Sequence, residues 1–171
     1  MDTQQKKEVW DAYLADGTRA GCDLIRGESI PRGLHHMVAE VFVCHKDGSI
    51  LLMQRDLDKP NYPGFWGSGA GGSVFKGESP LEGARRELLE ETGIRFDGEL
   101  PRIYHVVTDT TIYCGFLCVT DTAKDKITLQ EGETIAFRWV TPQEFRQIFT
   151  SDQFVDGLRE RLREFVTGSV L

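Results

Sequence analysis

The chain has 171 residues, of which 40% are hydrophobic, and a formal net charge of −7 at pH 7. This length suits one domain with a substantial core, and the acidic balance excludes extensive nonspecific binding to nucleic acid or to anionic membranes. The N-terminus lacks the apolar core of a signal peptide and no stretch approaches roughly eighteen apolar residues, so we expect a cytoplasmic protein.

The first predicted element is a hairpin. The runs VWDAYLAD and TRAGCDLI flank Asp16 and Gly17, a pair typical of tight hairpin turns. We assign residues 1–32 to this extension and residues 33–171 to the core of a single domain that spans residues 1–171. Within the core, the runs MVAEVFVC and SILLMQR are joined by a turn at residues 46–48 and predict two central strands.

A glycine-rich stretch, PGFWGSGAGG, leads to a predicted helix. Ser79 and Glu82 form a capping box, and Pro80 suits the first helical position. Gly93 favours the left-handed conformation that ends many helices. The sequence therefore predicts a helix from Pro80 to residue 91 or 92. Its apolar stripe is expected at three positions: Leu81, Ala84 and Leu88.

The remaining segments complete an α/β pattern. The runs RIYHVVT and TIYCGFLCV predict a second hairpin, and TIAFRWV predicts one more strand. Thr141 and Glu144 form a second capping box. Four apolar residues follow helical spacing in a last predicted helix: Phe154, Leu158, Leu162 and Phe165. We expect a mixed β-sheet sandwiched by helices, with the N-terminal β-hairpin as an extension.

Three carboxylates, Glu87, Glu90 and Glu91, fall on one face of the helix that begins at Pro80, because residues three and four apart are neighbours. Like charges repel, and carboxylates near a helix C-terminus also meet the unfavourable end of the helix dipole. An acidic helix face is often merely solvated. Here the glycine-rich stretch adds backbone carbonyls, and Mg²⁺ or Mn²⁺ prefers several oxygen ligands in a near-octahedral array. The pattern therefore predicts a site for a divalent cation.

The run GGSVFKGESPLEGARRELLEETGI resembles the Nudix box, and every defining position from Gly72 to Ile94 is filled. The flanking strand pattern is similar to that family's domain from about Gly33 onward. The resemblance implies a Nudix fold and a metal-dependent pyrophosphohydrolase that cleaves the diphosphate linkage of a nucleoside diphosphate derivative or a similar small molecule.

The resemblance also assigns roles by position. The metal ligands it implies are Glu87, Glu90 and Glu91, with Glu78 as an auxiliary ligand and the carbonyl of Gly71 or Gly72 as a further one. Arg86 would orient the glutamates through ion pairs. The general base is expected to be Glu87, or else a glutamate from a later loop, Glu131 or Glu133.

Substrate contacts are less specific in the sequence. Arg55, at the end of SILLMQR, is a candidate for binding a phosphate, and Trp66 or Phe65 for stacking on a base. Each also has a purely structural interpretation: Arg55 as an ion-pair residue at a strand end, and the aromatic residues as packing beneath the loop. Nucleotide sugars, ADP-ribose, dinucleotides, damaged nucleoside triphosphates and small diphosphate alcohols all remain open as substrates.

Three alternatives concern activity and assembly. A Nudix-fold module that senses nucleotides or ADP-ribose without turnover is one, although such regulators often lose acidic residues that are present here. The lead-in to the box also resembles isopentenyl-diphosphate isomerase, but Gly71 and Ser73 stand where that enzyme has a catalytic cysteine and a metal-binding histidine, and only His36 remains in an isomerase-like position. A homodimer that uses the N-terminal hairpin is a further hypothesis.

The cysteines and adjacent histidines are expected to be structural. The four cysteines lack CxxC spacing and are predicted to be free and mostly buried: Cys22, Cys44, Cys114 and Cys118. His35 and His36 face opposite ways in an extended segment, so we expect one to be packed and the other exposed.

Overall fold

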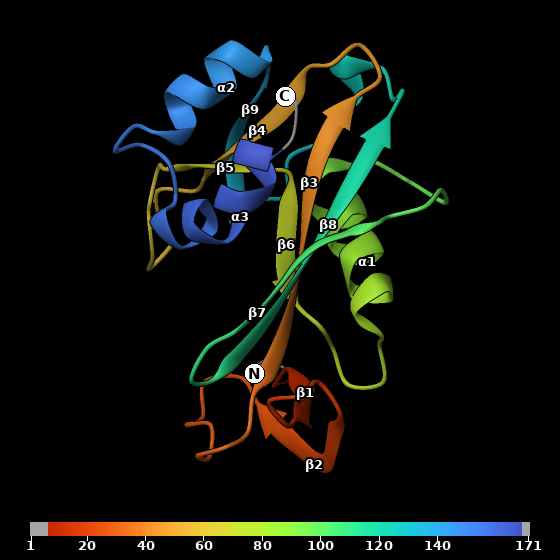
Figure 1. Ribbon diagram of the computed structural model, residues 1–171, viewed down its shortest axis with the longest axis vertical. Helices are drawn as coiled ribbons and strands as arrows, with labels where there is room; N and C mark the ends of the chain where they lie inside the picture. The colour runs from red at the N-terminus through yellow and green to blue at the C-terminus, as the bar shows by residue number, and fades with distance from the viewer. Residues whose placement is uncertain (1–6, 169–171) are drawn as a thin grey trace, which may run out of the picture.

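The computed structural model describes residues 7–168, and Figure 1 shows how their elements are arranged. The elements in chain order are β1 (Val9–Tyr13), β2 (Arg19–Ile25), β3 (His36–His45), β4 (Ile50–Arg55), β5 (Trp66–Ser68), β6 (Ala70–Ser73), α1 (Pro80–Thr92), β7 (Arg102–Val107), β8 (Thr111–Thr120), the 3₁₀ helix η1 (Lys124–Lys126), β9 (Thr134–Val140), α2 (Pro142–Phe149) and α3 (Asp156–Gly168). No helix in this part of the chain is long and apolar enough to cross a membrane.

A mixed sheet forms the centre of the molecule. Its strands follow the order β5-β4-β3-β8-β7, while β6 also pairs with β3 and β9 with β4. The pairing of β3 with β8 is parallel over the whole length of both strands, and the other pairings are antiparallel. The predicted hairpin β7-β8 is confirmed, and the two predicted central strands, β3 and β4, are antiparallel and pair beside the turn that joins them.

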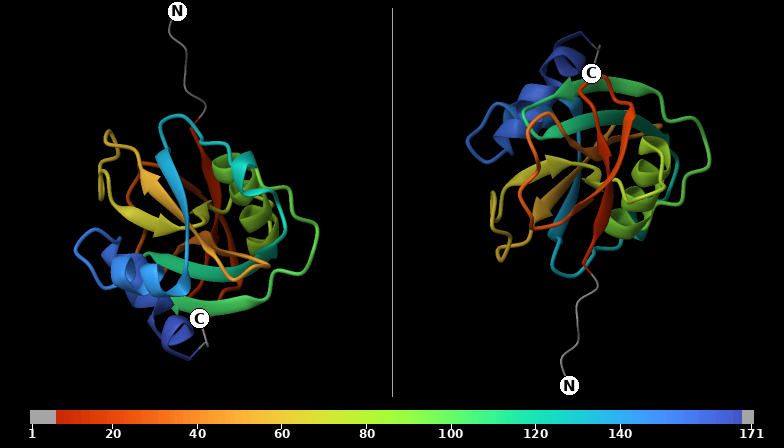
Figure 2. Two further views of the ribbon diagram at one scale, coloured as in Figure 1. Left: turned by 90° about the horizontal axis from the view of Figure 1, so that it is seen from above. Right: turned by 90° about the horizontal axis from the view of Figure 1, so that it is seen from below.

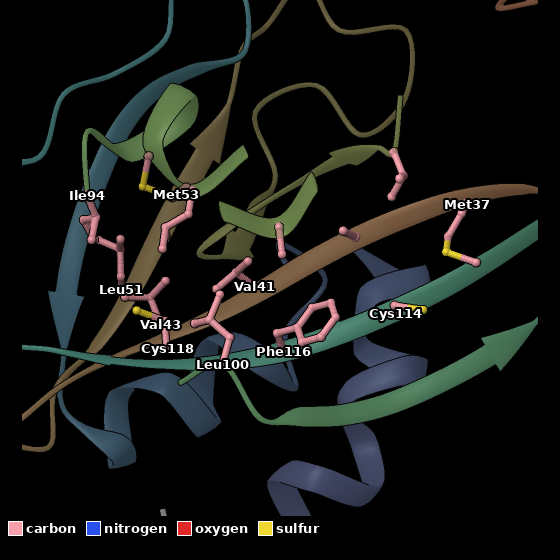
Figure 3. Packing of buried hydrophobic residues seen from close by; sticks show 14 of the residues in the cluster. Met37, Val41, Val43, Leu51, Met53, Ile94, Leu100, Cys114, Phe116 and Cys118 are labelled. Atoms are coloured by element: carbon pink, nitrogen blue, oxygen red, sulfur yellow. The ribbon is translucent and has the colours of Figure 1, made fainter. Parts of the chain in front are cut away.

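Helices cover the sheet on both sides, as Figures 1 and 2 show for α1 on one side and for α2 and α3 on the other. The central strands supply apolar side chains to both layers, which is typical of a sheet that is buried on two faces. On β4, Leu51 and Met53 join the core beneath α1, whereas Ile50 and Leu52 join the core beneath α2 and α3. Figure 3 shows part of the first core, built from β3, β4, β8 and neighbouring residues.

The N-terminal hairpin β1-β2 lies at one end of the sheet (Figure 1). It has a small core of its own, built from Trp10, Ala12 and Leu24, with Phe75 packed against it. Backbone hydrogen bonds between Tyr13 and His35 join it to the start of β3. The prediction of a hairpin in this segment is confirmed.

Helix α1 begins and ends where its capping residues predict. The Ser79 side chain accepts a hydrogen bond from the Glu82 N–H, and Glu82 accepts one from the Ser79 N–H. Gly93 ends the helix in the left-handed conformation, with a φ of 75°. Ala84 and Leu88 are fully buried against the sheet, but Leu81 is 37% exposed, so its assignment to the apolar stripe was wrong. Leu81 lies in the first turn of α1 and is not part of the core beneath the helix.

Three further expectations need correction. The glycine-rich stretch, for which we predicted no strand, contains the short strands β5 and β6. Phe154 is fully buried but precedes α3, and it forms a β-bridge with Trp66 instead of the first turn of a helix. His35 is buried as one of the two histidines should be, whereas His36 is half-buried because it stacks on Trp10, with ring centroids 4.6 Å apart.

Candidate active site

The acidic face of α1 borders a cavity of about 460 Å³. Other parts of the wall come from β4, β5, β6, α3, the loop at residues 56–65 and the N-terminal hairpin. The wall carries six carboxylates and five cationic side chains: Glu8, Glu40, Glu87, Glu90, Glu91 and Glu133, with Arg26, Arg55, Lys59, Arg86 and Arg161. Such a concentration of charge in a concave site favours a charged ligand.

Arg86 organises the acidic residues around itself. Its guanidinium donates to both carboxylate oxygens of Glu78, at 2.7 and 3.0 Å, and to Glu87 at 2.6 Å. It also donates to Glu90 at 3.2 Å and stacks on the Phe75 ring at 3.7 Å. These contacts match the orienting role expected for Arg86. Although partial burial disfavours the charged carboxylate of Glu78, the bonds from Arg86 and the Phe75 N–H hold its pKa below the usual value.

The glycines ahead of α1 permit a close approach that other residues would block. A Cβ at Gly72 would lie 2.4 Å from a carboxylate oxygen of Glu87, and one at Gly71 would lie 2.9 Å from the Glu40 side chain. The Gly71 N–H instead donates to Glu91 at 3.3 Å. The strand β6 therefore lies directly against the carboxylates of α1, which places backbone oxygens of this strand near the glutamates.

Glu91 has the most perturbed carboxylate in the cavity. Burial, together with the neighbouring carboxylates of Glu87 and Glu133, raises the pKa of Glu91 to about 8. Burial also raises the pKa of Glu87, against the opposing effect of Arg86. Perturbed carboxylates in a cleft are typical of functional sites, because stability alone would favour their removal.

The two loop glutamates lie in different surroundings. Glu133 lines the cavity and pairs with Lys59 at 2.5 Å. Glu131 is exposed and does not line the cavity. The structure therefore brings Glu133, but not Glu131, to the carboxylates of α1.

Among the proposed substrate contacts, only Arg55 lines the cavity. Its Nε donates to the Asn61 carbonyl at 3.0 Å, and within residues 7–168 it forms no salt bridge. Trp66 packs into the core beneath α2 and α3, and Phe65 contacts the Tyr62 ring, so neither aromatic residue reaches the cavity. The aromatic residues that do line it are Tyr62, which has a φ of 52°, and Phe75, on which Arg86 stacks.

Several cavity residues carried no signal in the sequence. Glu8, Arg26, Lys59, Glu40 and Arg161 come from the hairpin, a loop, β3 and α3, and only the folded chain brings them together. Arg161 donates to both oxygens of Glu40, at 2.5 and 2.7 Å, and lies 3.8 Å over the Tyr113 ring. Isolated charged residues in separate elements have no spacing that would reveal such a cluster.

The donor set fits a hard divalent cation in its chemistry, since it consists of carboxylates beside backbone oxygens. Within the described part of the chain, however, no three carboxylate, histidine or cysteine groups converge as ligands of one ion. Arg86 holds Glu87 and Glu90 by ion pairs, while Glu91 forms no salt bridge within residues 7–168.

Comparison with known proteins places the chain in a family. Residues 34–164 match the model of the NUDIX domain. An uncharacterized Nudix hydrolase of Listeria monocytogenes is 32% identical over 151 residues, covering 86% of this chain and 88% of that protein. A crystal structure from Deinococcus radiodurans shares the fold, with a TM-score of 0.74 at 19% identity, and covers 96% of this chain and all of that one.

The comparisons also include isopentenyl-diphosphate isomerases. An isopentenyl-diphosphate Delta-isomerase of Streptomyces avermitilis is 38% identical to this chain, but only over 64 residues, which is 37% of this chain and 32% of that enzyme. An isopentenyl-diphosphate delta-isomerase of Schizosaccharomyces pombe matches over 166 residues, which is 84% of this chain and 72% of that enzyme, but at only 24% identity, against 32% for the Listeria protein.

Proposed function

The chain belongs to the Nudix hydrolase family, and from this premise we propose that it hydrolyses the diphosphate linkage of a nucleoside diphosphate derivative or a similar small molecule, with Mg²⁺ or Mn²⁺ as its cofactor. The observation that carries the proposal is the position of Glu91. Its carboxylate lies beside Glu87 and Glu133 with a strongly raised pKa and no cationic partner among the described residues. A bound cation would relieve this repulsion.

We propose Glu87, Glu90 and Glu91 as metal ligands, with Glu78 and a carbonyl of Gly71 or Gly72 in support. When bound, a divalent cation would neutralise phosphate charge and acidify a water molecule. Arg86 keeps Glu78 and Glu87 in place through its hydrogen bonds. Arg55, which has no acidic partner in the described chain, is available to donate to a substrate phosphate.

Glu87 and Glu133 are both suited to accept the proton of the attacking water. Burial raises the pKa of Glu87, which favours proton acceptance near neutral pH. Glu133 faces the same cavity but is paired with Lys59, so it would have to exchange that partner first. Glu131 is the weakest of the three candidates because its side chain lies outside the cavity.

The alternatives are a sensor without turnover and an isomerase. The presence of all four box carboxylates favours hydrolysis over sensing. Gly71 and Ser73 supply neither a thiol nor an imidazole at the positions that the isomerase would need, and a side chain at Gly71 would collide with Glu40. Hydrolysis is therefore the function that these residues support best.

A hydrolysis screen tests the proposal directly. Purified protein would be assayed with Mg²⁺, with Mn²⁺ and with a chelator, against nucleotide sugars, ADP-ribose, dinucleotides, nucleoside triphosphates and isoprenoid diphosphates, and the products would be identified. We expect metal-dependent cleavage between the two phosphorus atoms of at least one diphosphate. Binding of a nucleotide without turnover under every condition would support the sensor instead.

We also propose a homodimer in which the hairpin contributes to the contact. The outer edge of β2 pairs with no other strand among residues 7–168, and most of its side chains are exposed. An exposed edge strand can pair with a second chain, and symmetric pairs are the commonest oligomers. Light scattering at micromolar concentration would test this, and a monomer would rule it out.

A further inference from the structure

The Glu8–Arg26 ion pair lies on the wall of the cavity, although both residues belong to the N-terminal hairpin and precede the segment that matches the family model. Arg26 Nη1 donates to Glu8 Oε2 at 2.8 Å, and Trp10 Nε1 donates to the other oxygen at 2.6 Å. The two donors hold the carboxylate in one orientation. Glu8 is 21% exposed and Arg26 is 64% exposed, so both side chains remain partly accessible on the cavity wall.

The hairpin holds this pair in a fixed place relative to the glutamates of α1. The Lys76 N–H donates to the Val9 carbonyl at 3.0 Å, and the Gly77 N–H donates to Asp11 at 2.9 Å. Arg19 donates to the carbonyl of Glu78 at 3.0 Å. The hairpin is therefore hydrogen-bonded to the loop between β6 and α1. The same loop carries Phe75, whose ring lies beneath Arg86.

The cationic groups of the cavity limit the charge of the substrate. Four of the five are already paired with acids: Arg26 with Glu8, Lys59 with Glu133, Arg86 with Glu78, Glu87 and Glu90, and Arg161 with Glu40. Arg55 is the exception among the described residues. The Arg55 guanidinium and the proposed metal supply enough positive charge for a diphosphate. The additional phosphate of a nucleoside triphosphate would lie near carboxylates with no unpaired cation in the described part of the chain to neutralise it.

The Glu8–Arg26 pair retains unused hydrogen-bonding groups, and these indicate that it binds a part of the substrate other than a phosphate. Arg26 uses one of its five N–H donors on Glu8, and each carboxylate oxygen can accept a second bond. A hydroxyl both donates and accepts, so adjacent hydroxyls can bond to Glu8 and Arg26 together. An apolar group would desolvate the ion pair without replacing its bonds with water.

We infer that Glu8 and Arg26 are specificity-determining residues that bind the hydroxyls of a sugar attached to the diphosphate, so that a nucleoside diphosphate sugar is preferred over a nucleoside triphosphate or an alkyl-linked diphosphate. This inference rests on the proposed function. It names the substrate class of the same site and assigns its recognition to the hairpin.

The test compares kcat/KM for three substrates that share one nucleoside: the diphosphate sugar, the diphosphate alkyl ester and the triphosphate, all at saturating Mg²⁺. The variants are Glu8→Gln and Arg26→Gln. The matched control is Glu28→Gln, because Glu28 pairs with Lys7 on the same hairpin but does not line the cavity. Melting temperatures report whether each variant is folded.

We expect the native protein to prefer the sugar, and both variants to lose about 5-fold to 30-fold in kcat/KM for the sugar, mainly through KM. Glu8→Gln should improve the alkyl ester slightly, because there is no ion pair left to desolvate, and should improve the triphosphate, because a repelling charge is removed. Glu28→Gln should match the native protein for all three substrates.

Three results would overturn the inference: a native protein that cleaves the ester or the triphosphate as well as the sugar, variants that lose all three activities equally, or variants that behave like Glu28→Gln. If Glu8→Gln does not fold, Arg26→Gln decides alone, since its side chain is largely exposed. Absence of cleavage of any diphosphate by the native protein would instead refute the proposed function, and the inference with it.

Discussion

Glu90 and Glu91 are neighbours in the chain, but their surroundings differ. Glu90 is exposed and shares Arg86 with Glu87 and Glu78. Glu91 is half-buried and, among residues 7–168, accepts a hydrogen bond only from the backbone N–H of Gly71. Both carboxylates nevertheless point toward one cavity. Substitution by glutamine would keep their size and their ability to accept hydrogen bonds while removing the charge.

We predict that Glu90→Gln and Glu91→Gln lower metal affinity and turnover together, by at least about 10-fold each, because a neutral amide is a poor ligand for Mg²⁺. Folding should be preserved or improved, since repulsion among the carboxylates is relieved. Turnover measured against Mg²⁺ concentration checks this, with Glu164→Gln on the exposed side of α3 as the control. Native rates in both variants would contradict the proposed metal site.

The raised pKa of Glu91 predicts how the stability of the metal-free protein depends on pH. Its carboxyl titrates at about 8 in the folded chain, whereas an unfolded glutamate titrates near 4.3. Between these values the folded state binds more protons than the unfolded state. The free energy of unfolding should therefore fall as the pH rises through this window and level off above about 8.

Urea unfolding in the presence of a chelator, from pH 5 to 9, would measure this effect. We expect the native protein to lose stability with rising pH relative to Glu91→Gln, which lacks the titrating group. Identical slopes for the two proteins would show that Glu91 does not carry the shifted pKa.

At the scale of elements, helix α3 is joined to the sheet by apolar packing and by a mostly buried ion pair between Arg161 and Glu40. Arg161 forms two hydrogen bonds with Glu40 on β3, and the Tyr104 hydroxyl donates to the same carboxylate at 2.6 Å. The two charged side chains are only 13% and 16% exposed. Removal of one partner would leave the other charge buried without compensation.

We predict that Arg161→Met lowers the free energy of unfolding by about 3 kcal/mol, near the lower end for a broken buried pair. Arg163→Gln on the same helix should cost less than about 1 kcal/mol, because its partner Glu160 is 63% exposed. Urea unfolding of the two variants compares them directly. Equal losses would mean that the Glu40 pair contributes no more than a surface contact.

Local sequence rules predicted those elements whose ends are set by their own residues. Capping boxes located the starts of α1 and α2, and the left-handed glycine located the end of α1. The strands β5 and β6 escaped prediction because seven residues rich in glycine have no period, and they become strands only by pairing with β4 and β3. Phe154 kept helical spacing with α3 by coincidence, since it precedes the helix and its side chain is buried against the rings of Phe145 and Phe149.

The same distinction applies to the candidate site. The glutamates of α1 and their bond partner Arg86 occupy one short segment, so their spacing on a helix was sufficient to bring them together. Arg55 reached the cavity as expected, but Trp66 was directed into the core by the pairing of β5 with β4. The contributions of Glu8 and Arg26 depend on the docking of the hairpin, which no local pattern specifies.

At the scale of the whole molecule, the four cysteines report on whether the folded layers are intact. All four are free thiols. Cys22 lies on the exposed hairpin, whereas Cys114 and Cys118 are buried on β8 and Cys44 is partly buried on β3. Burial raises the pKa of Cys44 to about 11 and that of Cys118 to about 12, and it also raises the pKa of Cys114. The reactive thiolate is therefore scarce at these three positions near neutral pH.

We predict that an alkylating reagent labels one thiol rapidly in the native protein at pH 7.5 and all four after unfolding in urea. Mass spectrometry of the labelled peptides should identify Cys22 as the fast site, and Cys22→Ser should remove the rapid phase without changing the melting temperature, because the side chain is exposed on β2. Rapid labelling of Cys114 or Cys118 in the folded state would show that the β3-β8 layer opens on the timescale of the reaction, contrary to a sheet covered by helices on both faces.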